Sequence, residues 1–526
     1  METTLDNLNS LGAFAPELVL CAGIVAVLSV SFARWDAGRL AVGVAALTCV
    51  AAVVAAIVTA PASPQRLFGG LLARDPFADF FKLLLPASGA LICGLTLHAR
   101  EEAGAAGRAT TTARDREAPE FFALLLAVIL GAQLMAAANN LLMLYLALEL
   151  SSLASYALAG FSRRSRRSSE AALKYVVYGG VASGVMVYGL SLLYGLASSL
   201  EFSRVQAALI DAPAPVALLA TGLCLAGLGF KVAAVPFHSW CPDVYEGAPV
   251  TVAAFLSIVP KAGGFALLLR LFANPEGPNV GGALSFGAVP WPMLALVLAA
   301  ASMTLGNLAA LAQRNVKRLL AYSSIAHAGY LFLGLAAGPV GHKAILFYLG
   351  AYLFATVAAF GVLIAVIERQ PPGAASAAAA EDLSAWAGLS RRSPFLAFVM
   401  TVTLFSLAGL PPTAGFLGKY YLFSALVAVG RSTGEAMYFV AALLAVINTV
   451  VSLAYYLRIV RAMYLVAPPP DLAPAGSTSS SSSSSPWFLP ALLGGLALAT
   501  LALGVFWGPL DALAGASSTL LTSGPR

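Results

Sequence analysis

The stretch GLGFKVAAVPFHSWCPDVYEGAP, from Gly227 to Pro249, places a lysine and a helix breaker inside one of the most apolar regions of the chain. Lys231 is followed five residues later by Pro236, and another apolar run begins directly after Pro249. Proline removes a backbone donor and clashes with the preceding turn, so the freed carbonyl groups must find partners inside the protein or in water. The stretch therefore predicts a helix that is broken at a polar point.

Composition places this helix, and the rest of the chain, in a membrane. Of the 526 residues, 60% are hydrophobic and only 10% are charged, and the mean hydropathy is +0.85. The apolar runs are mostly about 20 residues or longer, which is the length a helix needs to cross a hydrocarbon core of about 30 Å. Because strand-sized alternating segments are absent, a barrel is not expected. We predict an all-α polytopic membrane protein with about fourteen spans: 12–33, 40–60, 77–98, 119–138, 141–160, 172–198, 214–245, 250–272, 287–311, 319–337, 344–367, 394–430, 436–458 and 487–510.

Lysines and arginines in the loops predict the orientation of these spans. If side one is the side of the N-terminus, the predicted loops on side two hold 19 of these residues and those on side one hold 7. Cytoplasmic loops carry such an excess, so side two is predicted to be cytoplasmic and both termini to lie outside. No cleavable signal is expected, because METTLDNLNS lacks a basic region. The net charge of +6 then reflects topology and gives no support to nucleic-acid binding.

Cysteine and histidine usage excludes several chemistries. The five cysteines include no C-x-x-C pair, and the four histidines have no paired spacing for haem or zinc. His238, Cys241 and Asp243 lie close together, but one short loop rarely supplies a complete metal site. No glycine motif for phosphates or dinucleotides occurs. We therefore expect this chain to bind no metal, nucleotide or redox cofactor itself.

Ionisable residues near the middle of predicted spans are the remaining candidates for chemistry. A charge at that depth costs about 2.5 to 3.5 kcal/mol on insertion scales, so such a residue normally faces a partner or a hydrated cavity. Each could be a structural ion pair or polar contact between helices, but five at similar depth favour a transport role. They are Glu149, Lys231, Lys261, His327 and Lys419.

Glu149 and Lys231 are natural partners because their charges are opposite and their predicted depths are similar. Burial disfavours the charged form of a lysine, whereas a nearby carboxylate favours it. Moving the carboxylate would switch the lysine between holding and releasing a proton. The two residues are therefore predicted to form a proton valve.

A second interrupted span occurs at GLPPTAGFLGK, residues 409–419, and carries Lys419. Its predicted interruption comprises Pro411, Pro412, Gly415 and Gly418. The broken spans are the seventh and the twelfth, so they run in opposite directions, as in inverted-repeat transporters. The same offset relates the span with Glu149 to the span with His327.

We therefore predict two inverted five-helix repeats with two broken helices. The predicted organisation is an N-terminal three-helix segment at 1–118, repeats at 119–272 and 287–458, a Pro/Ser-rich linker at 459–486, and a C-terminal helix and tail at 487–526. Within it, the stretches 371–382 and 468–486 are expected to be mobile tethers, because their Pro, Gly, Ala and Ser content cannot bury a core.

Long phrases of the chain closely resemble the subunit N family of the bacterial proton-pumping NADH-quinone oxidoreductase, respiratory complex I, over roughly residues 119–460. The wider family includes larger antiporter-like subunits of that complex, subunits of multisubunit cation/proton antiporters and membrane subunits of some hydrogenases. The forms SSIAHAGY and EAALKY are more similar to subunit N than to those other members of the wider family. The phrases are LALELSSLASYAL, SSEAALKYVVYGGVASGVMVYGLSLLYG, GFKVAAVPFHSWCPDVYEGAPVTVAAFLSIVPKAG, QRNVKRLLAYSSIAHAGYLFLGL and GLPPTAGFLGKYYLF.

The resemblance implies a proton-translocating, antiporter-like membrane subunit that is driven by quinone reduction elsewhere in the complex. It implies that Glu149 and Lys231 gate one half-channel, that Lys261 is a central relay and that Lys419 leads toward the other half-channel. His327 would join the polar axis between Lys261 and Lys419. NADH, FMN, iron–sulfur clusters and quinone are expected in partner subunits and none in this chain. The implied partners are other membrane subunits of complex I and the lipid bilayer, and the implied location is the bacterial cell inner membrane with periplasmic termini.

Two other classes of function are compatible with this sequence. An autonomous cation/proton antiporter, or a subunit of a membrane-bound hydrogenase, would use the same lysines, and an antiporter would need its own substrate site. An assembly scaffold would tolerate their neutralisation. Copurification with flavin and iron–sulfur subunits would favour the respiratory complex, whereas transport by the chain alone in liposomes would favour an antiporter.

Overall fold

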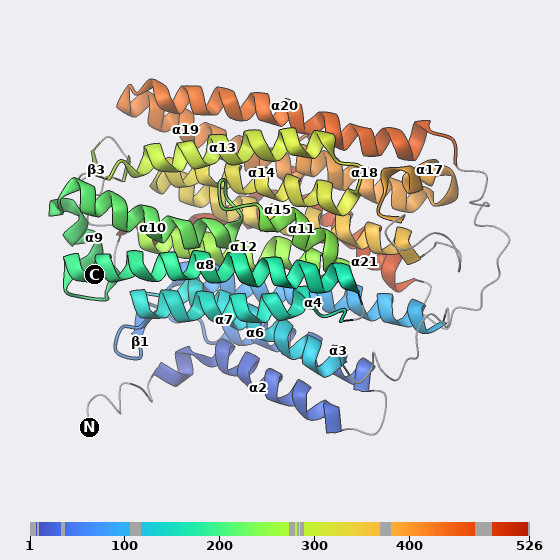
Figure 1. Cartoon of the computed structure of the whole chain (residues 1–526), viewed down its shortest axis with the longest axis horizontal. Helices are drawn as coiled ribbons and strands as arrows, with labels where there is room; N and C mark the ends of the chain where they lie inside the picture. Colours follow the sequence, from blue (N-terminus) through green and yellow to red (C-terminus); the bar gives the residue numbers. More distant parts are fainter. Residues whose placement is uncertain are drawn as a thin grey trace.

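A computed structural model of the chain describes residues 7, 10–32, 37–105, 117–163, 165–272, 279–280, 283–284, 289–368, 380–468 and 487–523. Its helices lie side by side as a bundle (Figure 1). Most of the two predicted tethers and both chain termini lie outside the described residues, so the predictions made for them stay predictions.

The first half of the chain is helical where it is described, apart from one short strand pair. They are α2 (Ala15–Ser29), η1 (Val30–Phe32), α3 (Ala37–Val58), β1 (Gln65–Leu67), β2 (Leu72–Arg74), α4 (Pro76–Ala105), α6 (Ala118–Ala137), α7 (Leu141–Ala159), α8 (Arg166–Ala197), α9 (Phe202–Asp211), α10 (Ala214–Val232), α11 (Trp240–Gly247) and α12 (Val250–Phe272).

The second half begins with a minimal strand pair and is otherwise helical where it is described. Its elements are β3 (Asn279–Val280), β4 (Ala283–Leu284), α13 (Trp291–Ala312), α14 (Val316–Ala336), α15 (Pro339–Glu368), η2 (Leu383–Trp386), α17 (Leu389–Arg392), α18 (Pro394–Ala408), α19 (Ala414–Thr433), α20 (Ala436–Leu465), α21 (Phe488–Val505) and α22 (Gly508–Ser523).

The predicted all-α polytopic fold is confirmed. Among the described residues, 13 helices are long and apolar enough to cross a membrane. Each coincides with one of the predicted spans, and the remaining predicted span, 394–430, is formed by α18 and α19 together. Long, continuous apolar runs determine this outcome, because only a helix satisfies its own backbone within such a run.

Several short elements were not predicted. The segment between α3 and α4 forms an antiparallel hairpin of β1 and β2, with a turn in which Phe68, Gly69 and Gly70 have positive φ. The predicted tail after residue 510 instead contains α22, which packs against α15 and α4. Its Asp511 carboxylate forms an ion pair of 2.7 Å with Lys343, so a polar contact between elements far apart in sequence fixes a segment with no long apolar run.

The centre of the bundle is formed by the helices that carry predicted site residues. In the most apolar stretch of each helix, 100% of the residues are buried in α12 and 94% in α14. In α2, α8 and α21 the buried share is 28%. The helices α12 and α14 carry Lys261 and His327. Both of these predicted site residues are therefore surrounded by protein and not by lipid.

The first predicted helix break is present and is stabilised by polar contacts. The helix α10 ends at Val232 and α11 begins at Trp240, so Pro236 lies in the non-helical segment between them. The carbonyl of Phe230 accepts a hydrogen bond of 3.1 Å from the Trp240 indole, and the Val235 amide donates to the Ser302 hydroxyl at 3.0 Å. These contacts satisfy backbone groups that the break would otherwise leave unpaired in an apolar interior.

The second break is narrower than predicted. Helix α18 ends at Ala408 and α19 begins at Ala414, so the two prolines lie in the break but Gly415 and Gly418 lie inside α19. Their glycine identity serves close packing instead, since a Cβ atom at Gly418 would lie 2.5 Å from Cδ2 of Tyr348.

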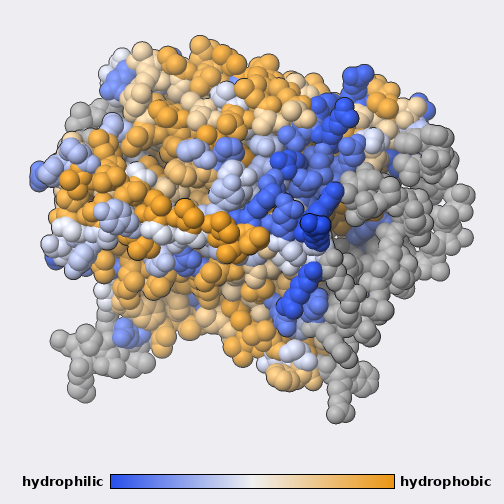
Figure 2. Space-filling model, viewed as in Figure 1, coloured by the Kyte–Doolittle hydropathy of each residue, from blue (hydrophilic) through white to orange (hydrophobic). Residues whose placement is uncertain are grey.

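The surface divides as expected for a protein that lies in a bilayer. Figure 2 shows the strongest hydrophilic colour in a band toward one end of the helices, while hydrophobic residues cover much of the remaining visible face. Exposed aliphatic side chains such as Val181, Leu443 and Val450 belong to the outer helices α8 and α20. Such a surface is unfavourable in water and stable against lipid or apolar partners.

Candidate functional site: a row of buried polar side chains

Lys231 lies in the last turn of α10 and points to α7. Its side chain is only 1% exposed, and its Nζ donates to the hydroxyls of Ser151 at 3.1 Å and Ser152 at 2.9 Å. Glu149 precedes these two serines on α7. Its side chain is partly exposed and accepts a hydrogen bond from the Ser183 hydroxyl of α8. The Lys231 ammonium group of α10 therefore reaches α7 close to Glu149, with serines as its direct contacts.

The stem of Lys231 also packs against the central helix. A Cβ atom added at Gly264 of α12 would lie 3.3 Å from Cγ of Lys231 and 2.6 Å from Cγ1 of Val232. Only a residue without a side chain leaves room for this approach. Gly264 is three residues from Lys261, so the end of α10 lies beside the helix that carries the central lysine.

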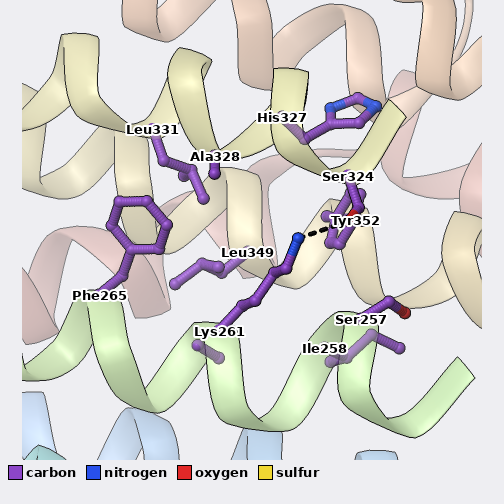
Figure 3. Close-up of a pocket in the computed structure, with 11 residues that line it drawn as sticks. Ser257, Ile258, Lys261, Phe265, Ser324, His327, Ala328, Leu331, Leu349 and Tyr352 are labelled. Atoms are coloured by element: carbon purple, nitrogen blue, oxygen red, sulfur yellow. Dashed lines mark hydrogen bonds between the residues drawn. The ribbon is translucent and has the colours of Figure 1, made fainter. Parts of the chain in front are cut away.

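Lys261 lies at the centre of α12 and reaches across to α14. Its side chain is 5% exposed, and its Nζ donates a hydrogen bond to the Ser324 hydroxyl (Figure 3). The ring of Tyr245 from α11 lies with its centroid 5.8 Å from the same Nζ atom. The second half of the broken helix therefore contacts the central lysine directly.

An internal cavity joins Lys261 to His327. Ser257 and Lys261 of α12, Ser324 and His327 of α14, and Tyr352 of α15 are among the residues that line it (Figure 3). The cavity has about 10 Å³ of space open to the centre of a water molecule, which is close to the minimum needed for one water. A single water and two hydroxyl groups could thus connect the lysine to the histidine side of the cavity.

His327 is held between two tyrosines. Its Nδ1 lies 2.5 Å from the Tyr348 hydroxyl and its Nε2 lies 3.3 Å from the Tyr456 hydroxyl, and Tyr456 also shares a hydrogen bond of 2.5 Å with Ser323. Both ring nitrogens therefore have partners that can donate or accept a proton. Figure 3 shows the ring turned away from the Lys261 ammonium group.

Lys419 ends the row at the second break. Its side chain is 3% exposed, and its Nζ donates to the carbonyl of Ala408, the last residue of α18, at 2.9 Å. The same Nζ lies 4.4 Å from the ring centroid of Tyr330, whose ring lies 6.0 Å from that of His327. Tyr330 thus lies between the histidine and the last lysine.

The structure therefore orders the five predicted residues along one path but brings no two of them into direct contact. Serines of α7 lie between Glu149 and Lys231, and a small cavity and tyrosines lie between Lys261, His327 and Lys419, whereas Lys231 approaches the helix of Lys261 through the packing of its stem on Gly264. These intermediate residues were missed in the sequence analysis, because a hydroxyl inside an apolar run is too common to stand out. The signal was present in the pairs of adjacent polar residues, Ser151 with Ser152 and Ser323 with Ser324.

Asp243, considered above as part of a metal site, has other partners. Its carboxylate pairs with Lys174 of α8 and with Arg318 of α14, both at 2.8 Å, and Arg318 also pairs with Glu246 at 2.7 Å. Lys174 also forms an i to i+4 ion pair with Glu170 at 2.9 Å. These ion pairs tie α11 to helices of both predicted repeats.

A further buried ion pair was missed in the N-terminal segment. Lys82 of α4 and Glu17 of α2 lie 2.9 Å apart, and their side chains are 1% and 0% exposed. Each residue lies near the start of its predicted span, 12–33 or 77–98, so a position near the middle of a span does not single out either of them. Their pair is separate from the row described above and joins two helices that precede the predicted repeats.

Comparison with known proteins places this arrangement in a family. Residues 138–445 match the profile of the family described as "NADH:quinone oxidoreductase/Mrp antiporter, TM". NADH-quinone oxidoreductase subunit N 2 of Sorangium cellulosum (strain So ce56) is 44% identical, over 96% of this chain and 97% of its own length. This chain belongs to the NADH-quinone oxidoreductase subunit N family.

Another member of the subunit N family, from Anaeromyxobacter sp. (strain Fw109-5), is 43% identical over 96% of each chain. A chain of respiratory complex I from Thermus thermophilus is 33% identical, has a TM-score of 0.72, and is matched over 95% of this chain and 99% of that one. A chain of the Mrp complex from Dietzia sp. DQ12-45-1b shares the fold, with a TM-score of 0.76 at 21% identity. The family predicted from the sequence phrases is confirmed.

Proposed function

We propose that this chain carries protons across the membrane as the antiporter-like subunit of an NADH-quinone oxidoreductase, with Glu149, Lys231, Lys261, His327 and Lys419 as the proton pathway. Membership of the subunit N family supports the assignment to the complex. The order of the five residues along the buried row supports the pathway.

The cavity shared by Lys261 and His327 carries the proposal. The cavity lies between the two most buried spans and has a polar lining. Lys231 and Lys419, each next to a helix break, lie on either side of it. A proton on Lys261 can pass to Ser324 or to a water in the cavity, then to the tyrosine-bound imidazole, because a hydroxyl group, a water and a neutral imidazole each both donate and accept. Lys231 and Lys419 would load and unload this centre.

The chain would perform no redox chemistry itself. NADH, FMN, iron–sulfur clusters and quinone would belong to partner subunits, and the free energy of quinone reduction would reach this chain through its contacts with them. The inferred location is the inner membrane of a bacterium, with the arginine-rich side two in the cytoplasm and both termini outside. Accessibility of tags placed at Met1 and Arg526 tests this orientation, and tags on opposite sides would contradict it.

The decisive test of the pathway is Lys261→Met in the assembled complex. The neutral side chain interrupts the relay without adding a buried charge, so quinone-coupled proton pumping should fall while the complex still assembles. The control is Arg204→Gln, since Arg204 is 70% exposed and its pair with Glu201 lies on the surface. Proton uptake by reconstituted vesicles measures the effect, and unchanged pumping with normal assembly would leave Lys261 a structural residue.

The family profile also includes Mrp antiporters, so the proposed function is tested against that of a cation/proton antiporter and of a membrane-bound hydrogenase subunit. Purification through a tag on this chain distinguishes these functions by the proteins that copurify with it. Flavin and iron–sulfur subunits in the purified assembly support the respiratory complex. Cation-driven proton transport by the chain alone in liposomes would support an antiporter.

A further inference from the structure

An arginine-lined cleft lies outside the buried row, where α13 ends and α14 begins. It has a volume of about 380 Å³ and is bounded by the α13–α14 turn, η2 and the last turns of α20. Its lining includes three arginines, Arg314, Arg458 and Arg461, and one acidic residue, Asp382. The cleft therefore has an excess of positive charge.

The walls of the cleft are held in place by contacts that need no ligand. The Leu383 amide donates to the Arg314 carbonyl at 2.9 Å, and the Gly388 amide donates to the Ala462 carbonyl at 3.1 Å. Arg458 donates to the carbonyl of Leu311 at 2.7 Å and to that of Gln313. The cleft is thus a formed feature of the fold, and Arg458 serves mainly to build it.

The other two arginines are available for a ligand. Arg314 and Arg461 are exposed, and within the described part of the chain neither guanidinium group has a hydrogen bond or an ion pair. The Asp382 carboxylate accepts a hydrogen bond of 2.9 Å from the Ser384 amide, which caps η2. Two unpaired guanidinium groups therefore face the cleft beside a carboxylate that already has a partner.

An apolar surface continues from the cleft along α20. Val466 lines the cleft and is 44% exposed, and Leu465 and Leu457 on the adjoining turns of α20 are 79% and 42% exposed. A ligand that fits this surface has an anionic head and an apolar body. Guanidinium groups bind phosphate oxygens in a fork geometry, and basic pockets between helices near the cytoplasmic surface bind anionic headgroups.

We propose that this cleft binds the phosphate headgroup of an anionic phospholipid, with its acyl chains along the exposed face of α20. The site rests on the position of this chain in a membrane and is independent of the proton pathway. Neither Arg314 nor Arg461 touches the buried row. A free phosphate ion shares the headgroup chemistry, but it would leave the apolar surface beside the cleft uncovered.

The test compares the intact complex carrying Arg314→Gln and Arg461→Gln together with the wild type. Each arginine near a membrane surface contributes about 1 kcal/mol to anionic lipid binding, so the double variant should retain the lipid roughly 30-fold less tightly. Mass spectrometry of lipids that copurify with the complex should show the loss of phosphatidylglycerol or cardiolipin, with zwitterionic lipid unchanged. The matched control is Arg391→Gln, an exposed arginine on α17 that does not line the cleft.

Two charge variants sharpen the test. Arg461→Lys keeps the charge and should retain most of the lipid, whereas Asp382→Asn keeps a capping side chain, removes the negative charge and should increase retention. In detergent, phosphatidylglycerol should raise the melting temperature of the wild-type complex but not that of the double variant. Equal stabilisation by inorganic phosphate alone would overturn the lipid assignment, and loss of a neighbouring subunit with unchanged lipid content would show that the cleft binds protein.

Discussion

Lys231 donates a hydrogen bond to Ser152 at 2.9 Å and so reaches α7 one helical turn beyond Glu149. Residues three apart lie on the same face of a helix, which places the carboxylate and the ammonium group along one face without an ion pair. Glu149 is meanwhile bound by Ser183 of α8. In the proposed valve, Lys231 therefore contacts a hydroxyl group and not the carboxylate. A small movement of Glu149 changes the electrostatic potential at the lysine without breaking a salt bridge.

The first prediction concerns the coupling of Glu149 and Lys231. Glu149→Gln removes the charge that favours protonated Lys231, and each 1.4 kcal/mol of lost interaction lowers the ratio of charged to neutral lysine about tenfold. Quinone-coupled pumping should fall in Glu149→Gln and in Lys231→Met, and the double variant should be no worse than the poorer single one. Glu149→Asp should be milder because its charge survives.

Proton pumping by the reconstituted complex, normalised to quinone reduction, measures the cycle. If the two single losses multiply in the double variant, the residues act independently and the coupled valve is wrong.

The second prediction separates the relay from the cavity that contains it. Ser324→Ala removes the hydroxyl that accepts the hydrogen bond of Lys261 and should lower proton pumping several-fold, though less than Lys261→Met does. Ser257→Ala is the matched control, because Ser257 lines the same cavity but donates to the Ala254 carbonyl of its own helix at 2.6 Å. Equal pumping losses in the two alanine variants would indicate that the cavity volume matters and the Ser324 contact does not.

The third prediction concerns the approach of α10 to α12. Gly264→Ala places a methyl group against Val232 and the stem of Lys231, and such overpacking costs about 1 to 3 kcal/mol. The melting temperature and the pumping ratio should both fall. Gly222→Ala is the control on α10, since a Cβ atom there meets nothing within 4 Å. Normal pumping in Gly264→Ala would show that the position of the lysine stem is not critical.

The fourth prediction treats the Lys82 and Glu17 pair as structural. Lys82→Met leaves a buried carboxylate alone and should destabilise the assembled complex by about 3 to 5 kcal/mol, whereas combining it with Glu17→Leu should restore most of the stability. Arg204→Gln is the control, because its pair with Glu201 is exposed and such pairs contribute about 0 to 1 kcal/mol. Thermal unfolding and pumping are measured together, and a stable double variant that pumps poorly would add this pair to the transport machinery.

Much of this fold follows from the sequence because its main signal is long-range hydrophobicity. The run from Val250 to Phe272 can only be a helix, and its end points were predicted to the residue. The prolines at the two breaks act locally, so their effect is visible in sequence as well. In contrast, α22 is held by packing and by the pair of Asp511 with Lys343, which no periodicity reveals.

The site was predicted less completely than the fold. A charge within an apolar run is conspicuous, so Lys231, Lys261 and Lys419 stood out. Their partners are hydroxyl and carbonyl groups whose role depends on how helices pack, as with Ser324 opposite Lys261. Sequence identifies which groups can carry a proton, and only the packing of the helices shows which neighbouring groups could transfer it.

The contact between Lys419 and the Ala408 carbonyl has a consequence for the balance of charge in the second half of the chain. Ala408 ends α18, and the aligned peptide dipoles of a helix place about half a negative elementary charge at such an end. Lys419 therefore faces a counter-charge built from backbone, which no proton can neutralise and no side-chain substitution can delete. Glu149 gives the first half a titratable counter-charge, whereas Lys419 contacts the carbonyl of a helix end whose partial charge does not change with pH.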